Sequence, residues 1–167
     1  RPPGAFFLLG GIETTVCGIC GILDYREGGI RKEVLQEMCG TFAYRGPDDE
    51  GYHVAPPVGL GHRRLSIIDL SPAGHQPMPN EDESVWIVFN GEIYNFNEIK
   101  SELPEYPFDS HSDTEVVLKA FHKWGVKAVD KFIGMFSFAI WDTLQKKLYL
   151  FRDRVGVKPL YYYFDEN

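Results

Sequence analysis

Apolar residues at helical spacing predict two amphipathic helices in this chain. The first spans residues 34–42, where apolar side chains recur every three or four positions and charged residues occupy the opposite side. The second begins at residues 112–115, whose Ser-Asp-Thr-Glu sequence is typical of a helix start that is capped by reciprocal Ser and Glu bonds. Its apolar stripe reaches Trp124, and Gly125 is a typical helix end.

Short runs of β-branched and aromatic residues predict strands around these helices. The runs cover residues 19–23, 52–55, 58–68, 85–89, 135–141, 147–151 and 160–164. A loop rich in Pro, Gly and Asn is expected over 69–84, and a short helix from Asn95 or Asn97 to Leu103. Because strands come in runs with helices segregated between them, the pattern predicts a layered α+β domain rather than alternating βαβ units.

The composition is typical of one folded domain and argues against nucleic acid and membranes as binding partners. The chain has 167 residues, of which 44% are hydrophobic, 14% aromatic and 25% charged, so it can build its own core. Its net charge of −7 should repel phosphate backbones and anionic lipids, which makes nucleic acid and membrane poor partners. Three cysteines are too few for a disulfide framework and are typical of a reduced, cytoplasmic protein.

The first sixteen residues show no clear period and contain a Pro2-Pro3 pair, so they are expected to be an extension outside the core. Their apolar stretch, residues 5–12, is far shorter than the ~20 residues that a membrane helix needs. A secretion signal is also a poor fit, because Thr14, Thr15 and Val16 are bulky for a small-residue cleavage site.

Cys17 and Cys20 form a C-x-x-C pair, which suggests a metal or redox site. A zinc site needs four ligands, and the sequence has no second such pair and no regularly spaced pair of histidines. If the segment is a strand, the two residues lie about 10 Å apart at ~3.3 Å per residue, too far for a disulfide. No metal and no cofactor is therefore expected, and a redox role remains a minor alternative.

Asn90-Gly91 follows a hydrophobic run and predicts a type I′ hairpin turn. Such a turn at a strand end would also present a backbone N–H and an amide side chain together, the two donors of an oxyanion hole. In the strand that contains Arg63 and Arg64, alternation turns one guanidinium inward, where it needs an anionic partner. That partner is either a bound carboxylate or an internal acid. Asp113 lies in the first helical turn, where a carboxylate is stabilised by the helix dipole.

Six motifs in this chain, in order, resemble those of class II glutamine amidotransferases, the N-terminal-nucleophile glutaminases. They are CGICGI (17–22), YRGPD (44–48), HRRLSIID (62–69), FNGEIYN (89–95), SDTE (112–115) and RDR (152–154). The residues of the third and fourth motifs are similar to those in the glutaminase domain of asparagine synthetases. The resemblance covers residues 17–167.

The resemblance implies a four-layer αββα sandwich and a pocket for L-glutamine. The Cys17 thiol would attack the side-chain amide to give a thioester and ammonia, and its own free α-amino group would act as the base. Asn90 and Gly91 would donate to the oxyanion. Arg64 would hold the substrate carboxylate, assisted by the backbone at Leu65, Ser66, Ile67 and Ile68. Glu92 and Asp113 would receive the substrate ammonium.

Two features depart from this pattern. Cys17 is not the first residue, and an amide nitrogen cannot accept the proton, so residues 1–16 are interpreted as a leader, a pro-segment or a mis-assigned start that places the true start at Val16. The ATP-dependent synthetase domain of asparagine synthetases, with its Ser-Gly-Gly phosphate loop, is not in the chain. The amidotransferase domain, residues 17–167, is therefore expected to be incomplete, and the chain is interpreted either as a fragment or as a stand-alone glutaminase whose synthetase partner is a separate protein.

These expectations define one main hypothesis and two alternatives. In the main hypothesis the domain supplies ammonia for asparagine synthesis. ATP and Mg²⁺ then bind only the missing synthetase domain, and the full-length form is a possible homodimer. In the first alternative the domain binds glutamine without catalysis while Cys17 stays blocked, and in the second the C-x-x-C pair serves redox chemistry.

Overall fold

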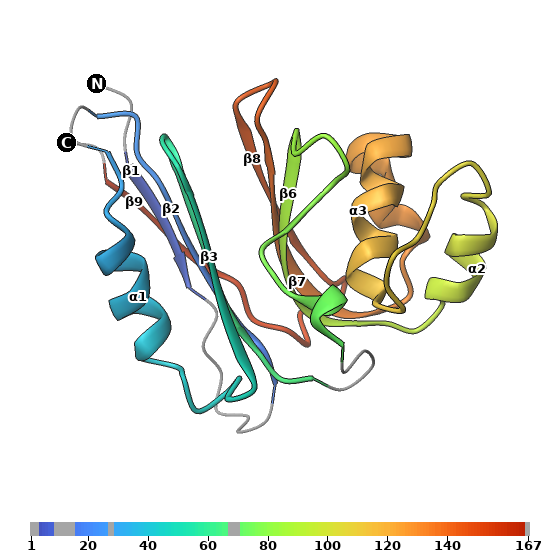
Figure 1. The fold of residues 1–167 in the computed structure, drawn as a ribbon, viewed down its shortest axis with the longest axis horizontal. Coiled ribbons are helices and arrows are strands. Elements are labelled where there is room, and N and C mark those ends of the chain that lie inside the picture. The colour runs from blue at the N-terminus through green and yellow to red at the C-terminus, as the bar shows by residue number, and fades with distance from the viewer. Residues whose placement is uncertain (1–3, 9–15, 27–28, 67–70, 166–167) are drawn as a thin grey trace.

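The computed structural model describes residues 4–8, 16–26, 29–66 and 71–165. Its elements form four layers, in which helix α1 (Lys32–Gly40) covers a five-stranded sheet and helices α2 (Phe96–Ser101) and α3 (Asp113–Trp124) cover a four-stranded sheet. The two sheets face each other in the middle (Figure 1). The predicted αββα sandwich is confirmed.

Three apolar clusters hold the layers together. The largest joins α2 and α3 to the four-stranded sheet and includes Val117, Phe121 and Phe138. A second lies between the two sheets and contains Ile19, Val58, Leu60, Val88, Ala139 and Trp141. The third, around Leu35 and Phe42, fixes α1 and its following turn to the five-stranded sheet. The side chains on each face of a sheet pack against a different layer, and this fixes the strand registers, because a slip by one residue would move every side chain of a strand to the opposite face.

The five-stranded sheet has the order β3-β4-β2-β1-β9, and all its neighbours are antiparallel. Its strands are β1 (Gly4–Leu8), β2 (Gly18–Leu23), β3 (Asp49–Ala55), β4 (Val58–Arg64) and β9 (Tyr161–Asp165). The strand β1 corrects the expectation that the first sixteen residues form only an extension. The sequence of this segment has no clear hydrophobic period that would predict the strand, and one of its two partner strands, β9, is distant in sequence.

The four-stranded sheet has the order β5-β6-β7-β8. Its strands are β5 (Met78–Pro79), β6 (Val85–Ile93), β7 (Gly134–Asp142) and β8 (Lys147–Arg152). The predicted hairpin turn at Asn90-Gly91 is wrong, because β6 continues through both residues, which pair with Ser137 and Phe136 of β7. A Cβ at Gly91 would collide with the Met135 carbonyl oxygen, so glycine is needed here for close strand approach rather than for a turn.

The helices mostly begin and end near their predicted bounds. Helix α1 begins and ends two residues before the predicted span. Ser112 caps α3 by accepting from the Thr114 N–H, but Glu115 does not complete a capping box; it accepts instead from the N–H groups of Asp109 and Ser110. Short 3₁₀ helices cover Pro72–Gly74 and Gly125–Lys131. Within the described residues, every helix falls short of the length and apolar character that crossing a bilayer requires.

Candidate active site

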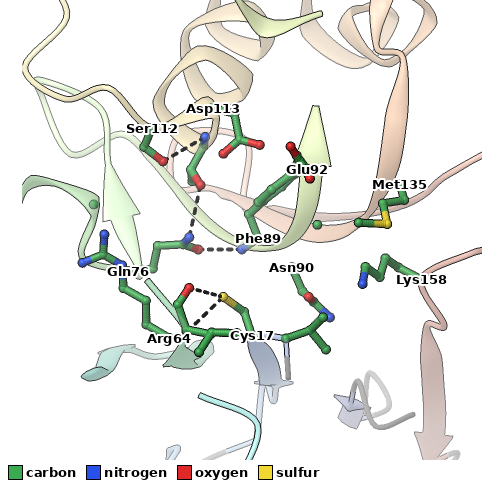
Figure 2. Close-up of a pocket in the computed structure, with 15 residues that line it drawn as sticks. Cys17, Arg64, Gln76, Phe89, Asn90, Glu92, Ser112, Asp113, Met135 and Lys158 are labelled. Atoms are coloured by element: carbon green, nitrogen blue, oxygen red, sulfur yellow. Dashed lines mark hydrogen bonds between the residues drawn. The ribbon is translucent and has the colours of Figure 1, made fainter. Parts of the chain in front are cut away.

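One pocket gathers most of the predicted site residues where the ends of β2, β4 and β6 meet the N-terminus of α3 (Figure 2). It is lined by Val16, Cys17, Arg64, Leu65, Gly74, Gln76, Phe89, Asn90, Gly91, Glu92, Ser112, Asp113, Thr114, Met135 and Lys158. Segments that are far apart in the chain therefore contribute to it, which explains why the motifs are scattered along the sequence.

The Cys17 thiol lies in this pocket, directly before β2. Its Sγ accepts a hydrogen bond from the Leu65 N–H at 3.3 Å and lies 3.6 Å from the Leu65 carbonyl oxygen. Burial raises the pKa of the thiol, while the Leu65 N–H and the Arg64 guanidinium partly offset this effect. A thiol of this kind needs a base before it can attack a substrate.

Asn90 carries a side-chain donor without a partner in the described structure. The residue is only 1% exposed, and its Nδ2 makes no hydrogen bond within the part of the chain that the structure describes. An unsatisfied buried donor costs about 1–3 kcal/mol, so it is retained only where something compensates. A substrate oxygen that enters the pocket would accept from this amide.

Arg63 and Arg64 point to opposite sides of β4, as alternation predicts. Arg63 pairs with Glu50 at 2.5 Å, while Arg64 reaches the pocket and its Nη1 donates to the Ser71 carbonyl oxygen at 3.0 Å. The guanidinium of Arg64 passes directly over Gly74, where a Cβ would collide with it. A cation is thereby held at one side of the pocket.

Two carboxylates lie at another side of the pocket (Figure 2). Asp113 Oδ2 accepts from the Ile93 N–H at 2.9 Å, and the residue is 4% exposed. Burial raises the pKa of Asp113 to about 6, and the nearby Glu92 adds to this rise. The pair is therefore suited to bind a positively charged group at neutral pH.

The backbone segment that follows Arg64 contributes less than predicted within the described residues. Leu65 lines the pocket and holds the Cys17 sulfur. Ser66 is not among the lining residues, and its N–H donates to Asp48 at 2.8 Å. Ile67 and Ile68 lie outside the described residues.

Cys20 does not face Cys17. Its Sγ lies 3.2 Å from that of Cys39, a residue of α1, and both side chains are fully buried free thiols. Among the described residues, no group of three or more His, Cys, Asp or Glu side chains could hold a metal ion.

Sequence reasoning missed Gln76, Met135 and Lys158 as pocket residues. Gln76 lies in the predicted loop over 69–84, and Lys158 lies shortly before β9. Neither Gln76 nor Lys158 lies in a periodic pattern that would predict the direction of its side chain. The one signal in the sequence was that both are polar residues that precede a proline, and the structure buries both.

Comparisons with known proteins agree with this geometry. The family described as glutamine amidotransferase domain matches residues 16–167. Asparagine synthetase (glutamine-hydrolyzing) 2 of Bacillus subtilis is 45% identical over 150 residues, covering 88% of this chain and 20% of the relative. The Zea mays asparagine synthetase (glutamine-hydrolyzing) is 40% identical over 147 residues, covering 87% of this chain and 25% of the relative.

Among solved structures, glutamine phosphoribosylpyrophosphate amidotransferase from B. subtilis superposes with a TM-score of 0.53 at 18% identity. The match covers 97% of this chain and 35% of that one. This likeness supports the fold, and the sequence matches define the family. The chain belongs to the glutamine amidotransferase domain family.

Proposed function

We propose that this domain hydrolyses L-glutamine to glutamate and ammonia. The observation that carries the proposal is the unpaired Asn90 amide, which lies in the same pocket as the Cys17 thiol. An amidase needs such a donor for the oxygen that becomes negative when the sulfur attacks. The cation on one side of the pocket and the two carboxylates on another match the charges of an α-amino acid.

The substrate is oriented by these charges. Arg64 binds the α-carboxylate, and Glu92 and Asp113 bind the α-ammonium, which directs the side-chain amide toward Cys17. A planar guanidinium can hold a carboxylate through two parallel hydrogen bonds, which adds geometric selection to charge. A ligand that lacks either α-group forgoes one of these charge-assisted contacts and therefore binds more weakly than L-glutamine.

Hydrolysis proceeds in two steps. The Cys17 sulfur attacks the amide carbon as its proton passes to the Cys17 α-amino group, and Asn90 Nδ2 and the Gly91 N–H stabilise the oxyanion. The α-ammonium then gives this proton to the leaving nitrogen, and the carbon–nitrogen bond breaks to give a thioester and ammonia. Water then adds to the thioester as the α-amino group takes its proton, the carbon–sulfur bond breaks with return of that proton to the sulfur, and glutamate leaves.

The α-amino group of Cys17 is the base in this proposal. Because burial raises the pKa of the Cys17 thiol, the sulfur keeps its proton until a base removes it. A terminal amine, with a pKa near ~7.7–8.0, can do this at neutral pH. An amide joined to Val16 cannot, so the proposal requires that residues 1–16 be absent from the active form or cut from Cys17.

We further propose that the ammonia serves asparagine synthesis. The matched relatives are named as glutamine-hydrolysing asparagine synthetases, and the chain spans 20–25% of their length. In a full-length protein of this kind, aspartate, ATP and Mg²⁺ would bind outside the glutamine amidotransferase domain.

A second candidate is a glutamine-binding module that does not turn over its ligand. It is favoured by the position of Val16, which lines the pocket while still joined to Cys17, and by β1, which is paired on both sides. In this form the pocket keeps its charged groups, but the sulfur has no base.

One experiment separates the two candidates. The chain is produced with residues 10–16 replaced by the recognition sequence of a protease that cuts directly before Cys17, and glutamate release is measured before and after the cut. We expect release only after the cut, and none from a cut Cys17→Ala variant. If the cut protein binds glutamine by calorimetry but forms no glutamate, the binding module is the correct interpretation. Equal turnover before and after the cut would overturn the role of the terminal amine.

A further inference from the structure

Gln76 joins two parts of the site that are distant in sequence. It is 5% exposed and lines the pocket from the segment shortly before β5. Its Oε1 accepts from the Phe89 N–H at 2.7 Å, and its Nε2 donates to Thr114 Oγ1 at 3.1 Å. Figure 2 shows this side chain bridging β6 and the start of α3.

The orientation of the Gln76 amide is fixed by its partners. A backbone N–H can only donate, so the atom that faces Phe89 must be the oxygen. The NH₂ group then faces Thr114. On the same residue, the Phe89 carbonyl oxygen receives a bond from His62 Nε2 at 3.2 Å, and burial lowers the pKa of His62 to about 3, so the ring is neutral.

The Gln76 and His62 side chains bond to the backbone of β6 at a position that β5 is too short to reach. β5 pairs with β6 only at Trp86 and Ile87, so Phe89 lies beyond the end of that ladder. Gln76 and His62 satisfy the backbone of Phe89 there. Without them, the edge of β6 immediately before Asn90 would lose its hydrogen bonds and its fixed position.

A second link joins β6 to α3 four residues further on. There the Asp113 carboxylate accepts from the Ile93 N–H at 2.9 Å. The two links use adjacent residues of α3, Asp113 and Thr114. The segment of β6 between them consists of Asn90, Gly91 and Glu92, which supply the oxyanion donors and one ammonium-binding carboxylate of the proposed function.

We propose that Gln76 is a positioning residue that holds this segment of β6 against α3. The inference rests on the proposed glutaminase function and deepens it. Both ends of the Gln76 amide bond to protein groups, the oxygen to the Phe89 N–H and the nitrogen to the Thr114 hydroxyl. Gln76 thereby fixes the peptide that precedes Asn90 and orients the oxyanion donors. Because the oxyanion exists only after attack, misplaced donors lower kcat more than they raise KM.

Asn80 provides a matched control within the same chain. Its side chain also accepts from a backbone N–H of β6, that of Val85 at 2.8 Å, and donates to a hydroxyl, that of Ser84 at 3.0 Å. It therefore makes the same two kinds of bond at the opposite end of the strand. Asn80→Leu should lower the melting temperature as Gln76→Leu does, but leave kcat unchanged.

The experiment compares kcat, KM and melting temperature in the full chain, cut before Cys17 after folding. We expect Gln76→Leu to lower kcat by about 10- to 100-fold with KM within about threefold of wild type. Gln76→Glu should restore most of kcat, because a carboxylate accepts from Phe89 and the Thr114 hydroxyl can turn to donate. Thr114→Val, which leaves the bond to Phe89, should lower kcat by a smaller factor, and the double variant should lose less than the product of the two.

The outcomes separate the inference from the function. If wild type turns over glutamine and Gln76→Leu loses no more kcat than Asn80→Leu, the positioning role is overturned and the function stands. If Gln76→Leu does not fold, Thr114→Val decides, and an unchanged kcat overturns the proposal. If cut wild type forms no glutamate, the function fails and the inference fails with it.

Discussion

Two asparagines offer a test of the oxyanion donor, because the same truncation should have opposite effects at the two sites. Asn80→Ala leaves the buried Val85 N–H without its acceptor, which should destabilise the fold by about 1–3 kcal/mol. Asn90→Ala instead removes an amide nitrogen that has no partner among the described residues. The relief of that penalty is of similar size and offsets the lost contacts, so stability should change by less than about 1 kcal/mol.

Activity should follow the reverse order. Loss of one oxyanion donor raises the barrier by about 2.7–4 kcal/mol, so Asn90→Ala should lower kcat by about 10²- to 10³-fold. Asn80→Ala should leave kcat unchanged. Urea unfolding followed by circular dichroism gives the stabilities, and glutamate release from the cut chain gives kcat. Equal losses of stability would mean that the Asn90 amide is already satisfied without ligand, and a kcat for Asn90→Ala within tenfold of wild type would refute its role as a donor.

Three further predictions concern pH, the second cysteine and the glycine of β6. Burial raises the pKa of Asp113 from an ordinary 3.8 to about 6, so between these pH values the folded protein holds a proton that the unfolded chain has lost. The free energy of unfolding should therefore fall by up to about 3 kcal/mol as pH rises from about 4 to about 6. Asp113→Asn should remove this pH dependence in urea titrations. For the same reason, KM for glutamine should rise as pH falls below about 6. Cys20→Ser should leave glutamate release unchanged at saturating glutamine, whereas a redox role for Cys20 requires its loss. Gly91→Ala should lower the free energy of unfolding by more than about 2 kcal/mol, because the new Cβ would collide with the Met135 carbonyl oxygen. Gly40→Ala is the control: its Cβ would meet open space, so the melting temperature should stay the same or rise.

Local patterns predicted those parts of the site that depend on neighbours in sequence. The start of α3 follows from Ser112 and the apolar stripe after it, and this places Asp113 at the helix N-terminus. The opposite directions of Arg63 and Arg64 follow from the period of a strand. Both inferences need only the geometry of a single element.

Contacts between different segments of the chain could not be predicted from local sequence patterns. Asn90-Gly91 has the sequence of a tight turn, but the register of β6 with β7 keeps both residues in a strand, since tertiary pairing overrides local preference. The position of Gln76 depends on where β5 stops, and the pairing of β1 depends on β2 and β9. Each of these also depends on a partner outside the local sequence: β7 for Asn90-Gly91, Thr114 for Gln76 and β9 for β1.

The place of β1 between β2 and β9 has a consequence for activation. A protease that severs the bond before Cys17 breaks one covalent link, but the ladders that join residues 4–8 to both neighbouring strands remain intact. The severed peptide would then stay in the sheet as a non-covalent subunit, and its departure would be a separate, slower event than the cut.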